Sequence, residues 1–183
     1  MSRENQSLNE SSIDNTDDRK RYEYQSKYDD CARGEIRYES IFLIIIILSS
    51  FFMIYLNWIG LLSNLCNITA DQNETFRRYI FYTASGLLGG STFSIKYFYR
   101  VVARGWWHQD RRIWRVSTPL LSSVIGFMTG VLIEAQLINT TIPSSAPSII
   151  AIGFLAGYFA DEAVGKMYEI ANVIFGSNNT KKG

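Results

Sequence analysis

Four long apolar stretches follow a strongly polar start in this chain. Residues 1–39 mix serine, asparagine and charged side chains, and from Ser40 onward apolar residues dominate. The apolar stretches cover 41–62, 76–99, 119–138 and a region that begins at Ser148. About 20 apolar residues carry a helix across the hydrocarbon of a bilayer, and no stretch shows the two-residue alternation of a barrel strand. The pattern therefore predicts an all-α integral membrane protein with four transmembrane helices.

Small residues recur every four positions inside three of these stretches. The positions are Gly86, Gly90 and Ser94; Ser122, Gly126 and Gly130; and Gly153 and Gly157. In lipid there is little hydrophobic force between helices, so small residues one turn apart let two backbones approach and gain van der Waals contact. In a soluble helix each glycine would cost about 1 kcal/mol relative to alanine. The pattern predicts tight helix packing, and three such faces on one short chain favour a homo-oligomer.

The composition divides the chain into three parts. Residues 1–39 form a polar cytoplasmic segment that is expected to be partly disordered, because it has too little apolar surface to fold alone. This segment is either a solvated leader or a docking site for a soluble partner. Residues 40–176 form the transmembrane domain, with an interfacial loop at 100–116 and a cytoplasmic continuation of the last helix over 160–175. Residues 177–183 are a polar tail.

The distribution of basic residues predicts the orientation. The loop 100–116 holds five arginines and one acid, whereas 63–75 and 139–147 hold no lysine or arginine. Cytoplasmic loops carry an excess of basic residues, so both termini and the 100–116 loop are predicted to face the cytoplasm. Cys31 and Cys66 then lie on opposite sides of the membrane and cannot pair within one chain.

The 100–116 loop interleaves aromatic and basic residues. A short helix here would place its indoles largely on one side and arginines on the other. Indoles favour the membrane boundary and guanidinium groups favour lipid phosphates. The predicted interfacial lipid anchor consists of Trp106, Trp107, Arg111, Arg112, Trp114 and Arg115. The alternative is a gating or lipid-sensing element in which His108, the one histidine, responds to pH.

Ionisable side chains within the apolar stretches are functional candidates, because charges are expensive inside a bilayer. Lys96 lies near the cytoplasmic end of its stretch, where its long side chain can reach the interface. Glu134 lies near the outer end of the third stretch, where it either attracts cations or caps a neighbouring helix. Together with Ser94, Asp161 and Glu162, these residues are the candidates for a polar path.

The setting of Asp161 and Glu162 depends on where the last helix begins. From Ser148, about 13 residues cover roughly 20 Å, which leaves both acids inside a hydrocarbon layer about 30 Å thick. They must then face protein, water or a basic partner. From Ile142, the same helix would bring Asp161 out at the interface.

The sequence does not contain the residue patterns that several classes of protein need for their function. The chain shows no Ser-His-Asp set, no His/Cys cluster at metal-ligand spacing and no nucleotide-binding glycine loop. The net charge of +1 gives no basic surface for nucleic acid. We therefore expect no enzymatic activity, no cofactor, no metal site and no nucleic-acid partner.

Two segments resemble a known type of membrane protein. One is ASGLLGG at residues 84–90, followed by YFYR at 97–100; the other is GFLAGYFADEAVGKMYEIANVIFG at 153–176. They resemble a group of small polytopic bacterial inner-membrane proteins with a glycine-rich middle helix, for which we know no established activity. The resemblance covers most of residues 80–176. It implies the same architecture and a bacterial inner membrane, and it transfers no catalytic residue.

The leading functional hypothesis is an oligomeric membrane channel or pore, in which Ser94, Glu134 and Asp161 line a path for ions or small solutes. A bacterial stress or anti-phage effector is the setting that would fit it. The alternative is a non-conducting membrane anchor or sensor subunit that recruits a cytosolic partner through its N-terminal segment and C-terminal helix. A small transporter ranks below both, because the first two stretches do not resemble the last two beyond their glycine spacing.

Overall fold

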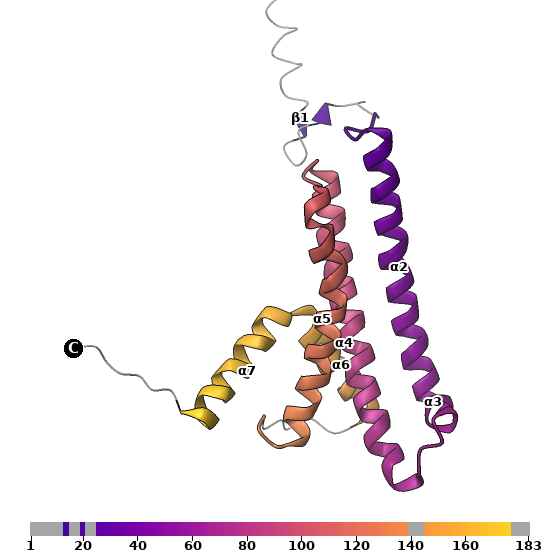
Figure 1. Cartoon of the computed structure of the whole chain (residues 1–183), viewed down its shortest axis with the longest axis vertical. Coiled ribbons are helices and arrows are strands. Elements are labelled where there is room, and N and C mark those ends of the chain that lie inside the picture. The colour runs from indigo at the N-terminus through magenta and orange to yellow at the C-terminus, as the bar shows by residue number, and fades with distance from the viewer. Residues whose placement is uncertain (1–12, 15–18, 21–24, 139–144, 177–183) are drawn as a thin grey trace, which may run out of the picture.

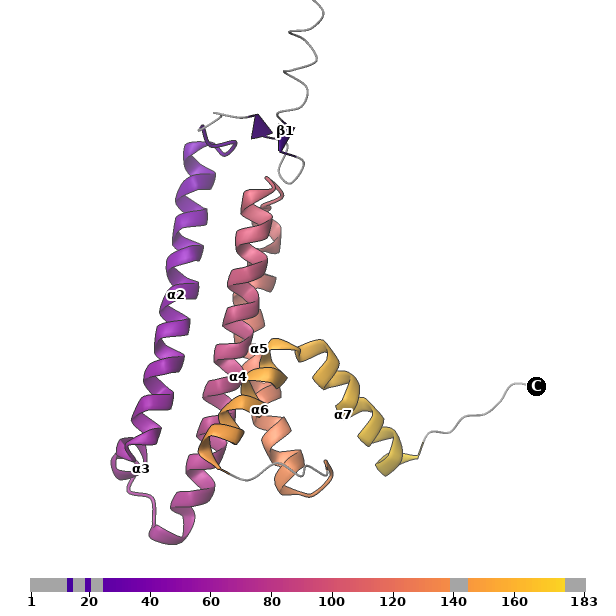
Figure 2. The same cartoon turned by 180° about the vertical axis from the view of Figure 1, so that it is seen from behind.

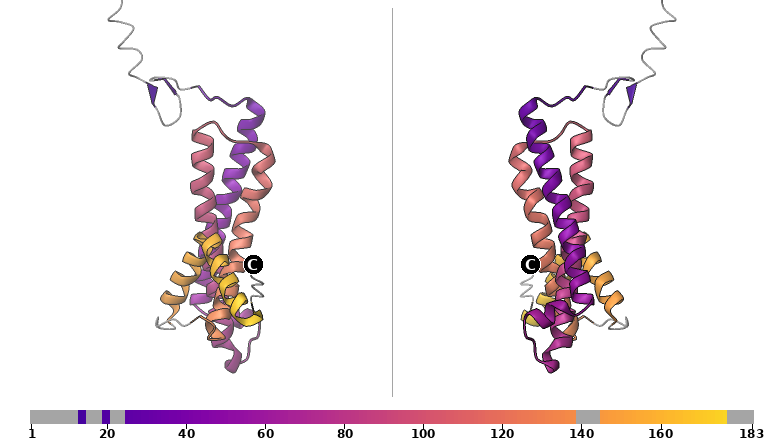
Figure 3. Two further views of the ribbon diagram at one scale, coloured as in Figure 1. Left: turned by 90° about the vertical axis from the view of Figure 1, so that its left-hand side faces the viewer. Right: turned by 90° about the vertical axis from the view of Figure 1, so that its right-hand side faces the viewer.

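The computed structural model describes residues 13–14, 19–20, 25–138 and 145–176. In these residues the chain is helical apart from a two-stranded antiparallel pair, β1 (Ile13–Asp14) and β2 (Arg19–Lys20). The three long helices are α2 (Asp30–Trp58), α4 (Ala70–Ala103) and α5 (Arg112–Glu134), which run along the long axis of the molecule (Figure 1, Figure 3). The shorter elements are α3 (Leu61–Leu65), the 3-10 turn η1 (Gln109–Arg111), α6 (Ala146–Tyr158) and α7 (Ala160–Phe175).

The described part of the chain contains two helices that are long and apolar enough to cross a membrane. One is α2, and the other runs from Gln109 to Glu134 and comprises η1 and α5. The bent pair of α6 and α7 makes a third if it counts as one span. The predicted helical architecture with membrane-length apolar helices is thereby confirmed. The helix α4, which contains the predicted stretch 76–99, is not among them.

The position of α4 explains its lower hydropathy. It packs against α2, α5 and α6, so much of its surface meets other helices. Several of its buried side chains carry hydroxyl groups, including Ser85 and Ser91. The Ser85 hydroxyl donates to the Phe81 carbonyl oxygen over 2.5 Å, and the Thr92 hydroxyl donates to the Leu88 carbonyl oxygen over 2.8 Å. Because these hydroxyls bond within their own helix, α4 can be polar in composition and still lie inside the bundle.

By contrast, α2 exposes most of its apolar side chains. Leu43 and Ser50 are fully buried, whereas Leu48, Phe52 and Tyr55 are more than half exposed. A continuous bare apolar surface of this kind is unusual on a soluble monomer and marks contact with another protein or a membrane. One side of α2 therefore packs on the bundle, and the rest fits a lipid environment.

The last apolar stretch is bent rather than straight. The helix α6 begins at Ala146, after the N-cap residue Ser145, and ends after 13 residues. At Phe159, with φ −105° and ψ 50°, the chain turns by 98° into α7, which leaves the bundle sideways (Figure 1, Figure 2). A helix over 160–175 is present as α7, but it does not continue along the axis of α6.

Two features favour the bend. Glycines hold α6 close to α4 up to position 157, and two acids follow directly in the first turn of α7. Acidic side chains are favourable at a helix N-terminus. No described residue of α7 is buried. The predicted polar tail at 177–183 and most of the predicted leader lie outside the described residues.

Candidate functional site

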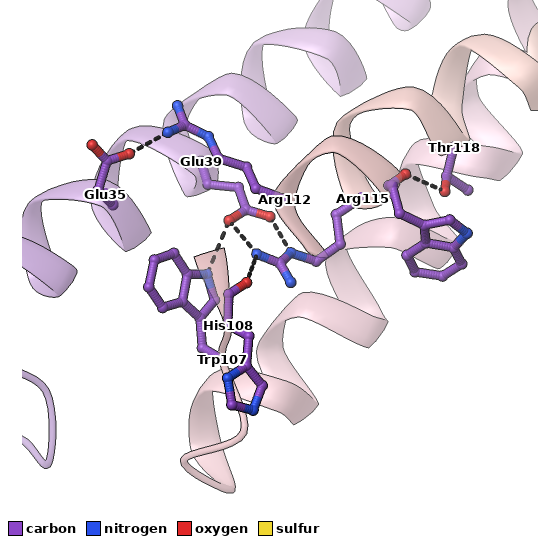
Figure 4. A network of polar contacts seen from close by, with 8 residues as sticks. Glu35, Glu39, Trp107, His108, Arg112, Arg115 and Thr118 are labelled. Carbon is purple, nitrogen blue, oxygen red and sulfur yellow. Dashed lines mark hydrogen bonds and ion pairs between the residues drawn. The ribbon is translucent and has the colours of Figure 1, made fainter. Parts of the chain in front are cut away.

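A buried ion pair joins α2 to α5 at the end of the bundle where α2 begins (Figure 4). The side chains of Glu39 and Arg115 are fully buried. The Arg115 Nη2 group donates to Glu39 Oε2 over 2.9 Å, and its Nε group donates to Oε1. The indole Nε1 of Trp107 donates to the same carboxylate over 3.0 Å. Buried charges need a partner and further hydrogen bonds, and this carboxylate has both.

Neighbouring contacts extend this network toward the N-terminal segment. The Arg112 guanidinium pairs with the Glu35 carboxylate. The Tyr28 hydroxyl donates to the Val102 carbonyl oxygen over 3.1 Å and accepts the backbone N–H of Trp107 over 3.3 Å. Residues 28–39 are therefore docked onto residues 102–115 at several points. We call this set of contacts the N-terminal lock.

The N-terminal lock changes the predicted role of the 100–116 loop. The loop is not one helix: α4 ends at Ala103, Gly105 adopts a left-handed φ of 74°, and η1 begins only at Gln109. A lipid-facing position for Arg115 is wrong, because Glu39 takes up its guanidinium group inside the protein.

The other residues of the predicted interfacial anchor are divided between protein and exterior. Trp107 and Arg112 are engaged in the N-terminal lock. Trp106, Arg111 and Trp114 are exposed, and the ring of Trp114 packs edge to face against Tyr97 at a centroid distance of 5.2 Å. The exposed half of the set can still meet lipid.

Polar contacts also join the helices at the opposite end of the bundle. The Arg77 side chain donates to the carbonyl oxygens of Asn57 and Trp58 over 3.2 and 3.0 Å. The Arg78 Nη1 group lies 3.1 Å from Glu134 Oε1 and its Nη2 group lies 2.5 Å from Glu74 Oε1. Glu134, the candidate for attracting cations, is thus paired with an arginine.

Sequence reasoning missed Arg77 and Arg78, because it included them in an apolar stretch. A local signal was present: Glu74 stands four residues before Arg78, a spacing at which opposite charges meet on a helix.

The predicted packing residues lie at close contacts between helices of one chain. A Cβ added to Gly126 would lie 2.7 Å from the Tyr82 carbonyl oxygen and 2.9 Å from Gly86 Cα, and one added to Gly157 would overlap the Gly86 carbonyl oxygen. The predicted packing residues that take part in these contacts, either as such a glycine or as the residue that it touches, are Gly86, Gly90, Ser122, Gly126, Gly130, Gly153 and Gly157. We call this set the glycine seam. Because the seam is used inside the chain, it no longer argues for contacts between copies.

A cleft opens at the bend between α6 and α7. Its volume is about 380 Å³, and its lining includes Lys96, Ser122, Asp161 and Glu162. Lys96 Nζ donates to the Tyr158 hydroxyl over 3.0 Å and lies 5.7 Å from the centre of that ring. In the part of the chain that the structure describes, the two acids have no ion-pair partner.

The structure therefore regroups the candidates for a polar path. Lys96, Asp161 and Glu162 line one cleft at the α6–α7 bend, Glu134 is at the far end with Arg78, and Ser94 is buried. No three His, Cys, Asp or Glu side chains within the described ranges form a group that could hold a metal ion. Comparison with known proteins finds no matching family model, no similar curated protein and no similar solved structure.

Proposed function

We propose that this protein is a non-conducting membrane anchor or sensor subunit whose N-terminal segment recruits a cytosolic protein partner. The observation that carries this proposal is the N-terminal lock, in which Tyr28, Glu35 and Glu39 tie the start of α2 to residues 102–115. Because buried charges fix the N-terminal segment to the bundle, a partner that binds and moves this segment also moves the helices. A leader that only solvated the N-terminus would need no such attachment.

The contacts give a pore less support than the sequence did. The glycine seam is occupied by packing between α4, α5 and α6. Glu134 pairs with Arg78, and Lys96 binds Tyr158. One observation still favours an oligomeric channel as the second candidate: Asp161 and Glu162 line a cleft with no ion-pair partner among the described residues. An anti-phage or stress setting belongs to that second candidate.

The proposed membrane arrangement places α2, α4 and α5 across the bilayer, with α6 and α7 as a broken fourth element. Its support is the central position of α4 between helices that present apolar side chains to the exterior. The N-terminal lock would face the cytoplasm of a bacterial cell, because the arginines of residues 100–115 gather there, whereas the arginines placed at the other end among the described residues are Arg77 and Arg78. A cytoplasmic C-terminus and the absence of enzymatic activity stay predictions.

Deletion of residues 1–24 tests the anchor. In cells, cross-linking of the full chain should give one reproducible cytosolic partner that the deletion variant loses, while deletion of residues 177–183 has no effect. The deletion variant should keep its helical circular dichroism, because the N-terminal lock begins at Tyr28.

Ion flux separates the two candidate functions. Liposomes that contain the purified full chain should remain impermeable to ions. Flux that disappears in Asp161→Asn with Glu162→Gln, from a protein that remains folded, would establish the channel and reject the anchor.

A further inference from the structure

The cleft at the α6–α7 bend is elongated along the bundle. A Cβ at Gly89 would lie 2.7 Å from the backbone nitrogen of Tyr158, so the bend is level with Gly89. Lys96 is seven residues further along α4, or about 10 Å at 1.5 Å per residue. On α5 the lining runs from Trp114 to Ile125, which is about 16 Å of helix. The cleft thus extends from the level next to the N-terminal lock into the apolar part of the bundle.

The walls of the cleft are amphipathic. Apolar side chains line its length, among them Phe93, Leu121 and Phe159. The Ser122 side chain also lines it, and its hydroxyl group is buried and has no hydrogen-bond partner within the described residues. This hydroxyl is fully buried against Gly90 of α4, so the polar character of the cleft comes from its charged side chains. A molecule that fits these walls has a polar end and an apolar body.

The charged side chains of the cleft indicate which charged groups the polar end of the ligand carries. Lys96 contributes one positive charge, and Asp161 and Glu162 contribute two negative charges, so the lining carries a net charge of −1. Asp161 and Glu162 are exposed at the opening of the cleft, and the described residues provide these two acids with no cation. A ligand with one ammonium group and one phosphate group complements this arrangement.

We propose that the cleft binds an aminophospholipid of the phosphatidylethanolamine type. The phosphate lies near Lys96, the ammonium group donates to Asp161 and Glu162, and one acyl chain follows Leu121 and Ile125. A primary ammonium donates hydrogen bonds to carboxylates, which the quaternary ammonium of phosphatidylcholine cannot do. Phosphatidylglycerol has no cation for the acids. The inference does not depend on the proposed anchor function, since an anchor and a channel alike can hold a lipid.

Native mass spectrometry of the purified full chain in detergent tests the proposal. Phosphatidylethanolamine, phosphatidylcholine and phosphatidylglycerol with identical acyl chains are titrated in turn. We expect phosphatidylethanolamine to bind about tenfold more tightly than either other lipid, as one additional charge-assisted contact predicts. Equal binding of the three lipids would overturn the proposal.

Two variants and a matched control locate the site. Asp161→Asn with Glu162→Gln should remove the preference for phosphatidylethanolamine, and Lys96→Met should weaken the binding of all three lipids. Glu169→Gln, which changes an exposed acid of α7 that pairs with Lys166, should bind like the unmodified chain. Circular dichroism shows that each variant is folded. A preference that persists in the double variant, or that Glu169→Gln removes, would place the lipid elsewhere and reject this cleft.

A competition experiment tests whether the ligand is a lipid or a soluble compound with the same headgroup. Glycerophosphoethanolamine carries the same headgroup without acyl chains, and at equal concentration it should not displace the lipid. Full displacement would make a soluble phosphoethanolamine compound the ligand and overturn the lipid proposal.

Discussion

The helices of this bundle are joined to one another in two different ways. Contacts of the central helix α4 with α5 and α6 use the glycine seam, where a Cβ on Gly86 would lie 2.7 Å from the Ser122 carbonyl oxygen and 3.0 Å from Gly126 Cα. The apolar part of α2 from Ile41 to Trp58 contains no glycine. Polar groups hold α2 at both ends instead: Glu39 pairs with Arg115 of α5 at one end, and Asn57 donates to the Arg77 carbonyl oxygen of α4 at the other.

The difference shows two ways to hold a helix where lipid competes for apolar contacts. Close backbone approach gains dispersion energy at every turn but admits no side chain. Polar contacts act at a few points, and their contribution to stability depends on burial. Removing the partner of a buried charge costs far more free energy than removing the partner of an exposed charge. We therefore expect substitutions in these regions to differ in size according to burial and steric room.

The largest effect is expected from Arg115→Met in the N-terminal lock. The substitution leaves the buried carboxylate of Glu39 without its cation, which should lower the free energy of unfolding by about 3 to 5 kcal/mol. Loss of the helical circular dichroism signal on titration with sodium dodecyl sulfate measures this change. Arg111→Met is the matched control, because Arg111 is exposed and its replacement should have little effect.

A second variant distinguishes the ion pair from simple packing. Glu39→Leu combined with Arg115→Met replaces both charges with apolar groups, and buried pairs replaced in this way often lose no stability. The double variant should recover most of the loss. If it is as unstable as Arg115→Met alone, the unpaired charge is not the cause.

The next largest effect is expected from Gly157→Ala in the glycine seam. The added methyl group would overlap the Gly86 carbonyl oxygen, so α6 must move away from α4, at a cost of about 2 to 3 kcal/mol. The same unfolding titration measures it. Gly165→Ala in α7 is the control, because nothing lies within 4 Å of a Cβ there. Equal stability of both variants would show that α6 does not rely on close approach.

A smaller effect is expected from Trp107→Phe. Phenylalanine keeps most of the ring but removes the Nε1 donor to Glu39, and a hydrogen bond to a charged group contributes about 1.5 kcal/mol at the lower end of its range. The loss should vanish in the background of Glu39→Leu with Arg115→Met, where the acceptor is absent. A loss of the same size in both backgrounds would assign it to packing of the ring.

The smallest effect is expected from Glu134→Gln at the opposite end. The Glu134 side chain is 34% exposed, and ion pairs with this much solvent contact contribute below about 1 kcal/mol. The change should shrink further as salt is added, because salt screens exposed charges. A loss as large as that of Arg115→Met would remove the distinction between the two ends.

The regular features of this fold follow from the sequence because they depend on local pattern. The stretch 41–62 anticipates the apolar part of α2, and 119–138 anticipates most of α5. The four-residue repeat of small residues around Gly86, Gly126 and Gly157 predicts close contacts between helices, and such contacts are present at these three positions. The repeat does not reveal whether the partner helix belongs to the same chain, because a small residue permits close approach by any helix.

The features that sequence reasoning missed depend on distant partners or on a break in a pattern. Arg115 shared the pattern of an interfacial arginine, and only the fold brings it to Glu39, which lies 76 residues earlier. The bend at Phe159 interrupts a stretch whose apolar residues continue at helical spacing on both sides. Among the candidates for a polar path, Lys96 lines the same cleft as Asp161 and Glu162. This grouping could not be predicted, because it depends on the bend between α6 and α7.

The separation of Glu39 from Arg115 has a consequence for biosynthesis. A ribosome adds about 5 to 20 residues per second, so the arginine emerges about 4 to 15 s after the acid it neutralises. During this interval α2 has left the ribosome with an unpaired carboxylate, which stays hydrated at the membrane surface because burial alone is too costly. Closure of the pair is therefore a late event, and a nascent chain arrested before Arg115 should expose Glu39 to water-soluble carboxyl reagents.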